Sequence, residues 1–224
     1  MSRCVALIPA AGSGVRLGGE RPKQYLTLAG KPMLWHSLRA LCVPPVEAVY
    51  VVLAPGDKGF GREDWSGLPI RVSPLYCGGA TRHESVLNGL VAAGLQTDDW
   101  VLVHDAARPC LPQEDLRRLV RECENDPVGG LLALPAADTV KRSGEDRRVA
   151  STEDRRHIWL AQTPQMFRAG LLREALGKAT GTVTDEAAAI EATGLKPKLV
   201  PGSGRNIKVT FPEDLAIAEA LLRS

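Results

Sequence analysis

Short apolar runs alternate with amphipathic helical segments along most of the chain, and this alternation limits the folds available to it. Each run is uninterrupted and bounded by turn residues, as in strands that are buried on both faces of a parallel sheet. The clearest strands are predicted at residues 5–8, 48–53, 100–104 and 129–135. Helices are predicted between them at residues 34–42, 81–93 and 116–123. This order favours an α/β fold with a doubly wound, mostly parallel sheet of the Rossmann-like kind.

The rest of the chain contains shorter elements with recognisable ends. Thr81 with Glu84, and Thr210 with Glu213, have the spacing of capping boxes, which gives Glu84 a structural role. Thr184 is the predicted N-cap of a helix over residues 185–192. Other helical segments are predicted at residues 60–65, 169–179 and from 210 onward, and short strands at residues 70–72, 158–161, 198–200 and 207–209.

Residues 136–156 break this pattern because they are polar and carry little apolar surface. Two short strands around a turn at residues 143–146 predict a β-hairpin arm. A two-stranded ribbon is only marginally stable in water, so we expect the arm to dock on another surface, such as a second subunit. A solvated loop is the alternative. The sequence shows no linker or internal repeat, so residues 1–224 are predicted to form one domain from which the arm protrudes.

The composition argues against several classes of partner. The formal net charge is +2 and aromatic residues make up 4% of the chain, which disfavours nucleic-acid binding. No apolar stretch approaches the roughly 20 residues of a membrane-spanning helix, and the first strand begins too early to leave room for a signal peptide. The five cysteines form no C-x-x-C pair, so we expect buried thiols in the reducing environment of the cytoplasm.

A glycine-containing loop follows the first strand directly and carries two basic residues. Gly12 and Gly14 let successive backbone N–H groups approach an anion, while Arg16 and Lys23 add positive charge. The dinucleotide pattern G-x-G-x-x-G fails at Leu17, and the chain has no Gly-Lys-Ser/Thr of a P-loop. The remaining pattern, G-x-G-x-R-x5-P-K, suits a polyphosphate and resembles the signature loop of nucleotidyltransferases. A glycine-rich surface loop without a ligand is the alternative.

Charged residues also follow later strands. In an open α/β sheet, ligands bind beyond the carboxyl ends of the strands, where Asp105, Arg108 and Lys208 are predicted to lie. Asp105 suits a Mg²⁺ ligand, since Mg²⁺ takes one or two carboxylates beside substrate phosphates. A capping aspartate and a solvent-facing Lys208 are the alternatives. Arg82, in the first turn of a helix, opposes the helix dipole and therefore predicts a nearby phosphate or acidic side chain. His104 is expected to be a packed, hydrogen-bonded histidine rather than a base.

Six motifs fall in one order along nearly the whole chain. They are PAAGSGVR with PKQY, VHDAARP, DTVK, TPQ, TDE and NIKVT, at residues 9–16 with 22–25, 103–109, 138–141, 163–165, 184–186 and 206–210. The set resembles the 2-C-methyl-D-erythritol 4-phosphate cytidylyltransferase family, nucleotidyltransferases of the non-mevalonate isoprenoid pathway. The resemblance implies that CTP and methylerythritol phosphate are joined to CDP-methylerythritol, with release of pyrophosphate and with Mg²⁺ as cofactor.

The same resemblance implies roles for individual residues. Those implied to bind the nucleotide are Ala10, Ala11, Gly12, Gly14, Gly79 and Ser85. Those implied to contact the triphosphate or to serve catalysis are Arg16, Lys23 and Lys208. Those implied on the acceptor side are Asp105, Arg108, Thr139, Arg155, Thr163 and Lys208. Arg155 is implied to reach the site of a neighbouring subunit, so a homodimer is expected. Ala80 and Thr81 stand where many members carry acidic residues, which leaves no comparable side chain at Ala80.

Three other functions fit parts of the sequence. A cytidylyltransferase for ribitol 5-phosphate or another pentitol phosphate would share the CTP loop. A sugar-1-phosphate nucleotidyltransferase is disfavoured by the intact stretch 103–109, and a non-catalytic nucleotide-binding module by the joint retention of Arg16, Lys23, Asp105 and Lys208. The chain has no G-x-S-x-G or H-E-x-x-H motif that would favour a hydrolase. We expect an in-line attack that depends on positioning and charge rather than on a general base.

Overall fold

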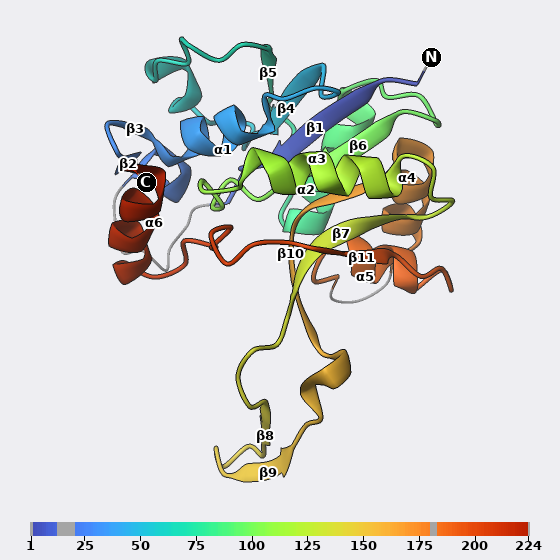
Figure 1. Cartoon of the computed structure of the whole chain (residues 1–224). Coiled ribbons are helices and arrows are strands. Elements are labelled where there is room, and N and C mark those ends of the chain that lie inside the picture. The colour runs from blue at the N-terminus through green and yellow to red at the C-terminus, as the bar shows by residue number, and fades with distance from the viewer. Residues whose placement is uncertain (1, 13–20, 180–182, 224) are drawn as a thin grey trace.

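A central β-sheet dominates the computed structural model, which describes residues 2–12, 21–179 and 183–223 (Figure 1). Within these residues, seven strands form the sheet in the order β11-β7-β10-β6-β1-β4-β5. Neighbouring strands are parallel except β10, which runs antiparallel to both β6 and β7. The predicted mostly parallel sheet is therefore confirmed. The strand bounds are Cys4–Pro9 (β1), Ala48–Val52 (β4), Arg71–Leu75 (β5), Trp100–Val103 (β6), Gly129–Pro135 (β7), Trp159–Arg168 (β10) and Lys198–Pro201 (β11).

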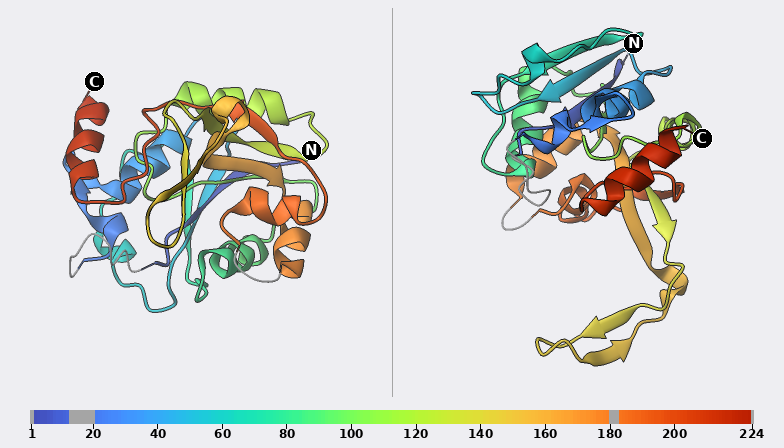
Figure 2. Two further views of the ribbon diagram at one scale, coloured as in Figure 1. Left: turned by 90° about the horizontal axis from the view of Figure 1, so that it is seen from below. Right: turned by 90° about the vertical axis from the view of Figure 1, so that its left-hand side faces the viewer.

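Helices cover both faces of this sheet, as a doubly wound fold requires (Figures 1 and 2). Strand β1 shows why its run is apolar without alternation: Ala6 and Ile8 pack in the core beneath α1 and α3, whereas Val5 and Leu7 pack in the core beneath α2, α4 and α5. All four residues are at most 1% exposed. The helix bounds are Met33–Leu41 (α1), Arg82–Ala92 (α2), Gln113–Cys123 (α3), Ala169–Lys178 (α4), Glu186–Glu191 (α5) and Glu213–Arg223 (α6).

Smaller elements surround this framework. Helix α6 packs near the two-stranded ribbon of Thr27–Leu28 (β2) and Lys31–Pro32 (β3), through a third apolar cluster. Within the described part of the chain, three short 3-10 turns are Lys23–Tyr25 (η2), Phe60–Arg62 (η3) and Arg155–His157 (η4). The turn predicted near residues 60–65 is thus confirmed as η3. None of the described helices is both long and apolar enough to cross a membrane.

The start of α2 follows the predicted capping box, with one shift. The Thr81 hydroxyl accepts a hydrogen bond from the Glu84 backbone N–H at 3.1 Å. The Glu84 carboxylate reaches back to the backbone N–H of Ala80, at 2.7 Å, instead of that of Thr81. Both side chains still satisfy backbone donors at the helix start, so the structural role of Glu84 is confirmed.

Two predicted helix caps were wrong, because a nearby aspartate makes the capping hydrogen bonds in place of the predicted threonine. Asp185 caps α5, because its Oδ1 accepts from the Ala188 N–H at 2.9 Å, whereas Thr184 is exposed. At α6 the Asp214 carboxylate accepts from the backbone N–H groups of Thr210 and Phe211, at 2.7 and 2.9 Å, while the Thr210 hydroxyl donates to the Lys208 carbonyl. An aspartate outcompetes a neighbouring threonine because its charged oxygens accept stronger hydrogen bonds.

The strand predicted at residues 207–209 does not form. This segment is irregular, and the backbone N–H of Val209 donates to the carbonyl of Ala107 at 2.8 Å, while that of Ile207 turns back to Arg205. Strand β11 already occupies the sheet edge beside β7. Residues 206–210 instead run across the loop that follows β6, which places Lys208 at the carboxyl end of the sheet.

The polar segment forms the predicted hairpin arm rather than an irregular loop. Lys141–Ser143 (β8) and Val149–Thr152 (β9) pair antiparallel. The arm leaves the sheet at the ends of β7 and β10 and extends away from it (Figure 1 and the right-hand view of Figure 2). Residues 141–152 are all exposed. The five cysteines all lie in the described part of the chain, where they are unpaired thiols, and four of them are buried.

Candidate active site

A cavity of about 290 Å³ opens where β1 and β6 end, at the edge of the sheet that was predicted to hold the ligand. It brings together residues from the loop after β1, from the start of α2, from the loop after β6 and from the 206–210 segment. Of the predicted site residues, those that line it are Ala10, Ala11, Gly12, Lys23, Gly79, Ser85, Asp105 and Lys208. The other two residues predicted on the first loop, Gly14 and Arg16, lie outside the described residues.

The described residues at the two ends of the first loop are held by hydrogen bonds to each other and to distant segments of the chain. The Ala10 N–H donates to Val52 O at 2.8 Å, and the buried side chain of Gln24 donates to Ala10 O at 2.9 Å. The Lys23 ammonium donates to the carbonyl of Val209, which ties this loop to the 206–210 segment. Gln24 was missed as a positioning residue from the sequence, although its place directly after Lys23 in the P-K-Q-Y motif was a usable signal.

Two glycines before α2 allow close packing, Gly78 against the first loop and Gly79 against the start of the helix. A Cβ atom on Gly78 would lie 2.3 Å from Ala11 Cβ, and one on Gly79 would lie 2.5 Å from Glu84 Cβ, so neither position has room for a side chain. Gly12 differs, because a Cβ there would meet nothing within 4 Å. Its glycine has no packing cause, which fits a backbone that must stay open to a ligand.

Ser85 lies at the base of the cavity on α2 and is 3% exposed. Its hydroxyl accepts from the Gly79 N–H at 3.1 Å and donates to the Thr81 carbonyl at 2.9 Å. These two bonds fix the turn that carries Gly79 against the start of the helix. The pair predicted for the cytosine and ribose side is therefore held as one unit.

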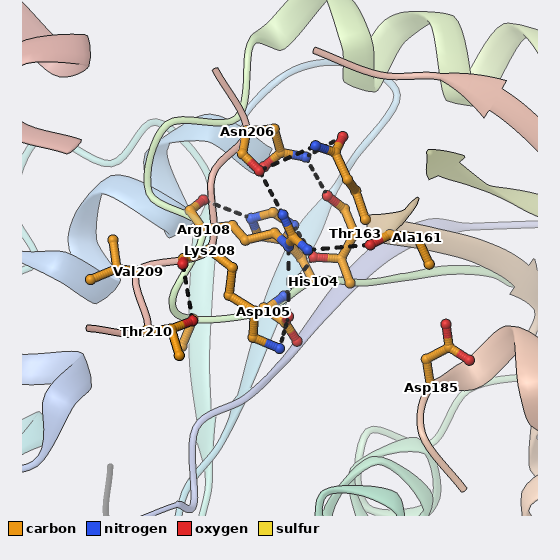
Figure 3. A network of polar contacts seen from close by, with 12 residues as sticks. His104, Asp105, Arg108, Ala161, Thr163, Asp185, Asn206, Lys208, Val209 and Thr210 are labelled. Atoms are coloured by element: carbon orange, nitrogen blue, oxygen red, sulfur yellow. Dashed lines mark hydrogen bonds and ion pairs between the residues drawn. The ribbon is translucent and has the colours of Figure 1, made fainter. Parts of the chain in front are cut away.

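Asp105 lies on the loop after β6 and is the centre of a cluster of charged side chains (Figure 3). Its Oδ2 lies 2.8 Å from Lys208 Nζ and 3.7 Å from Arg108 Nε, and its Oδ1 accepts from Arg82 at 3.1 and 3.2 Å. Burial alone would raise the pKa of Asp105, but the three cations hold that pKa well below its usual value. The carboxylate is therefore ionised throughout the physiological range.

The anion predicted beside Arg82 is supplied by two acidic side chains, those of Asp105 and Glu186, rather than by phosphate. Arg82 donates to both oxygens of Glu186, at 2.6 and 3.1 Å, in addition to Asp105. Glu186 is 1% exposed and begins α5. The sequence had placed Glu186 only within the TDE motif and gave it no role. An acidic residue in the first turn of a helix, followed by apolar residues, was the available signal.

Hydrogen bonds of His104 and Thr163 hold the loop after β6 in place. The His104 Nε2 faces the Arg108 carbonyl at 3.1 Å, and its Nδ1 faces the Thr163 hydroxyl at 3.0 Å. A carbonyl can only accept, so Nε2 carries the proton and Nδ1 accepts from the threonine. Burial lowers the pKa of His104 to about 4, which keeps the ring neutral. His104 is thus the packed, hydrogen-bonded residue that the sequence predicted.

The same contacts change the role expected of Thr163. Its hydroxyl donates to His104 and accepts from the Asp105 N–H at 3.0 Å, and the residue is 4% exposed. With its proton committed, this hydroxyl cannot donate to a substrate phosphate. Thr163 therefore orients Asp105 in this structure, and its hydroxyl keeps only one lone pair, as an acceptor.

A second cavity, of about 270 Å³, adjoins the first and shares Arg82, Asp105 and Lys208 with it. Arg108 and Thr163 also line it, as expected for the acceptor side. The remaining lining residues are Ala161, Gln162, Gln165, Thr184 and Asp185. Two predicted acceptor residues are not brought here within one chain, since Thr139 and Arg155 are exposed on the arm and line neither cavity.

Asp105 does not fit the metal site that its residue type suggested. Both of its oxygens are occupied by three protein cations, so Mg²⁺ would enter as a fourth positive charge. Among the described residues, no group of three or more His, Cys, Asp or Glu side chains could hold a metal ion. The site residues fit Mg²⁺ only when the ion is coordinated by a bound triphosphate, which suits its preference for phosphate oxygens and water.

A glycine-containing phosphate loop after the first strand, joined to a cationic second cavity, defines a nucleotidyltransferase of the α/β class. Comparison with known proteins narrows this class. Residues 4–224 match the family model described as 2-C-methyl-D-erythritol 4-phosphate cytidylyltransferase. The chain therefore belongs to the 2-C-methyl-D-erythritol 4-phosphate cytidylyltransferase family.

Relatives and solved structures agree with this family over the full length. The enzyme of this name from Dechloromonas aromatica is 58% identical, with 100% of this chain and 99% of the relative covered. That of Nitrosospira multiformis is 57% identical over the same shares. A crystal structure of a 4-diphosphocytidyl-2C-methyl-D-erythritol synthase has a TM-score of 0.85 at 39% identity, with 99% of each chain covered. The Thermus thermophilus enzyme has a TM-score of 0.81 at 33% identity and covers 100% of both chains.

Proposed function

We propose that these two cavities are the active site at which the chain joins CTP to 2-C-methyl-D-erythritol 4-phosphate and releases pyrophosphate. The observation that carries this proposal is the wall of Arg82, Asp105 and Lys208 that the two cavities share, which supports a nucleotide and an acceptor bound side by side. A nucleotidyl transfer needs this adjacency, because the acceptor oxygen must lie in line with the leaving pyrophosphate.

The first cavity takes the nucleotide. Ala10, Ala11 and Gly12 on the first loop face the triphosphate, and the Gly79–Ser85 unit faces the cytosine and ribose. Lys23 lies at the same wall, and Gly14 and Arg16 are assigned to the triphosphate by the sequence alone. When bound, Mg²⁺ neutralises part of the charge on the triphosphate, and we assign it no protein ligand.

The second cavity takes the acceptor phosphate. A phosphate oxygen is already a nucleophile, so the protein has to supply no general base. This agrees with the site, where His104 is buried and neutral and Asp105 is tied to three cations. Lys208 lies between both cavities, so its ammonium is placed to oppose the negative charge that grows on the α-phosphate during the attack.

The arm completes the acceptor site of a second copy of the chain, so that the protein acts as a homodimer. Thr139 and Arg155 are exposed on the arm and have no role within their own site. A fully exposed ribbon also gains stability when it docks on another surface. The unpaired, mostly buried cysteines support a cytoplasmic location.

The test is release of pyrophosphate from CTP with each acceptor in turn. We expect rapid release with 2-C-methyl-D-erythritol 4-phosphate and a strict requirement for a divalent cation. Release only with ribitol 5-phosphate would mean that ribitol 5-phosphate, and not methylerythritol phosphate, is the acceptor. Binding of CTP without release, whatever the acceptor, would reduce the chain to a nucleotide-binding module.

A further inference from the structure

Arg82 stands on the wall shared by both cavities, yet its charge is already balanced by protein. It makes four hydrogen bonds, two to Asp105 and two to Glu186. A guanidinium has five N–H donors, so one at most remains for a ligand. Arg82 therefore lacks the open donors of a phosphate clamp and instead joins two carboxylates.

Glu186 forms the end of this bridge away from Asp105 and lines neither cavity. It is 1% exposed and follows Asp185, which caps α5 and accepts from the Gln165 side chain at 2.9 Å. Asp185 and Gln165 do line the acceptor cavity. The bridge thus connects two walls of that cavity, namely the loop after β6 and the start of α5.

We propose that Glu186 and Arg82 are positioning residues for the acceptor. Their bridge fixes the carboxylate of Asp105, and through Asp105 the ammonium of Lys208, relative to the wall formed by α5. Neither residue has to touch the acceptor phosphate for this. The inference rests on the function proposed above, because it assigns the second cavity to the acceptor.

The electrostatic surroundings support this role. Besides Arg82, the cations that face Asp105 are Arg108 on its own loop and Lys208 on the 206–210 segment. Glu186 has no second ion pair within the described residues, and Asp185 beside it adds a like charge. Without Arg82, two buried carboxylates would face each other, and the loop after β6 would move away from α5.

The test compares Glu186→Gln, Arg82→Gln and the double variant with the wild type. Steady-state release of pyrophosphate gives the KM for each substrate, and thermal unfolding gives Tm. We expect Glu186→Gln to raise the acceptor KM roughly 10-fold, as the loss of charge-assisted bonds predicts, and to change the KM for CTP less than about twofold. Arg82→Gln should have a smaller effect on the acceptor KM in the Glu186→Gln background than alone, because both act through one bridge.

Arg3→Gln is the matched control. Arg3 donates to the buried Asp99 at 2.8 and 3.2 Å, in a similar pair at the opposite ends of β1 and β6. Its loss should lower Tm and leave both KM values unchanged. If Glu186→Gln behaves in the same way, the bridge is merely structural and the inference is wrong. A wild-type protein that releases no pyrophosphate would contradict the proposed function instead.

Discussion

Single residues in this site have their hydrogen-bonding capacity largely committed before any substrate arrives. Asp105 is held by three cations, and Thr163 by His104 and by the Asp105 backbone. Groups fixed in this way do not have to reorganise when charge develops, which is the main source of electrostatic catalysis. Lys208 pairs directly with this fixed frame, and Lys23 is held close to Lys208 through the carbonyl of Val209.

For Lys23→Ala we expect kcat to fall by roughly 10²–10³, as for the loss of one preorganised donor. The tertiary structure should survive, because Lys23 is only half-buried and begins the short turn η2 outside the sheet and the main helices. Pyrophosphate release measures the rate, and circular dichroism checks the fold. Lys178→Ala, which removes an exposed lysine on α4, is the control. Near-normal turnover in a folded Lys23→Ala variant would remove Lys23 from the catalytic group.

His104 makes the stability of the protein depend on pH. Burial lowers its pKa from 6.5 to about 4, so between these values the unfolded chain binds more protons than the folded one. The free energy of unfolding therefore falls as the pH falls through this range, by about 3 kcal/mol in total. In His104→Gln a side-chain amide N–H takes the place of the ring N–H toward the Arg108 carbonyl, and the new side chain cannot titrate.

Urea unfolding from about pH 7 to about pH 4.5 measures this contribution. The wild type should lose more stability over that range than His104→Gln does. Carboxylates common to both proteins contribute equally and cancel in the difference. Identical pH dependence in the two proteins would mean that His104 is not held neutral.

At the level of residues, the sequence predicted many of the side chains that meet in the two cavities, but not what each one is paired with. The prediction that Arg82 needs an anion followed from the helix dipole and is confirmed, because Glu186 and Asp105 supply it. The role of Glu186 could not be foreseen, since it depends on α5 approaching α2 from 104 positions away. Asp105 looked like a metal ligand because a residue type does not reveal how many cations surround it.

At the scale of elements, the site depends on loops that are packed together at the carboxyl edge of the sheet. The loop after β1 lies against Gly78, and the 206–210 segment lies across the loop after β6. Each contact is made by backbone or by a methyl group, so small changes in volume should displace the loop. The nucleotide cavity is thus as sensitive to packing as the hydrophobic core.

Gly78→Ala should therefore weaken CTP binding without touching CTP. Its Cβ would lie 2.3 Å from Ala11 Cβ and 2.9 Å from the Leu53 carbonyl, so the first loop has to shift. We expect the KM for CTP to rise about tenfold or more and the free energy of unfolding to fall by about 1–3 kcal/mol. Gly177→Ala in α4, where a Cβ meets nothing within 4 Å, should leave the KM unchanged and stabilise slightly. Equal KM values in both variants would show that this contact does not shape the cavity.

Most elements followed from the pattern of apolar residues, and the exceptions have a common cause. Strand β10 was expected only as a short run at residues 158–161, yet it extends to Arg168 and runs antiparallel. Its middle is polar and buried there because distant residues satisfy it: the Gln162 side chain donates to the carbonyls of Ser203 and Asn206, about 40 positions further along the chain. Residues 207–209 read as a strand because they alternate locally, but the available edge was already taken by β11.

At the scale of the whole molecule, the arm separates residues that the resemblance places in one site. The arm, which carries Thr139 and Arg155, extends away from the sheet (Figure 1), whereas Asp105 and Lys208 form an ion pair in the loops at the carboxyl edge of the sheet. The proposal that Arg155 acts on a neighbouring subunit can be tested by mixing two impaired variants at an acceptor concentration below the KM of Arg155→Ala. Arg155→Ala lacks the arm cation, and Lys23→Ala lacks the nucleotide cation.

Arg155→Ala alone should raise the KM for the acceptor. After unfolding and refolding together, a mixed dimer of the two variants has one site with both residues intact, because Lys23 comes from one chain and Arg155 from the other. We expect this mixture to regain a substantial part of wild-type activity, while each variant refolded alone does not. No recovery in a mixture that forms mixed dimers would mean that Arg155 serves its own chain.

The exposure of the arm also bears on how its sequence can change. Residues 141–152 lie outside the hydrophobic clusters and are all exposed, and surface substitutions of this kind usually alter stability by less than about 0.5 kcal/mol. In the sheet, by contrast, a new side chain has to fit the packing before it can affect chemistry. Natural variation in the arm is therefore nearly free of the demands of folding, and a substitution there reports on what the arm contacts.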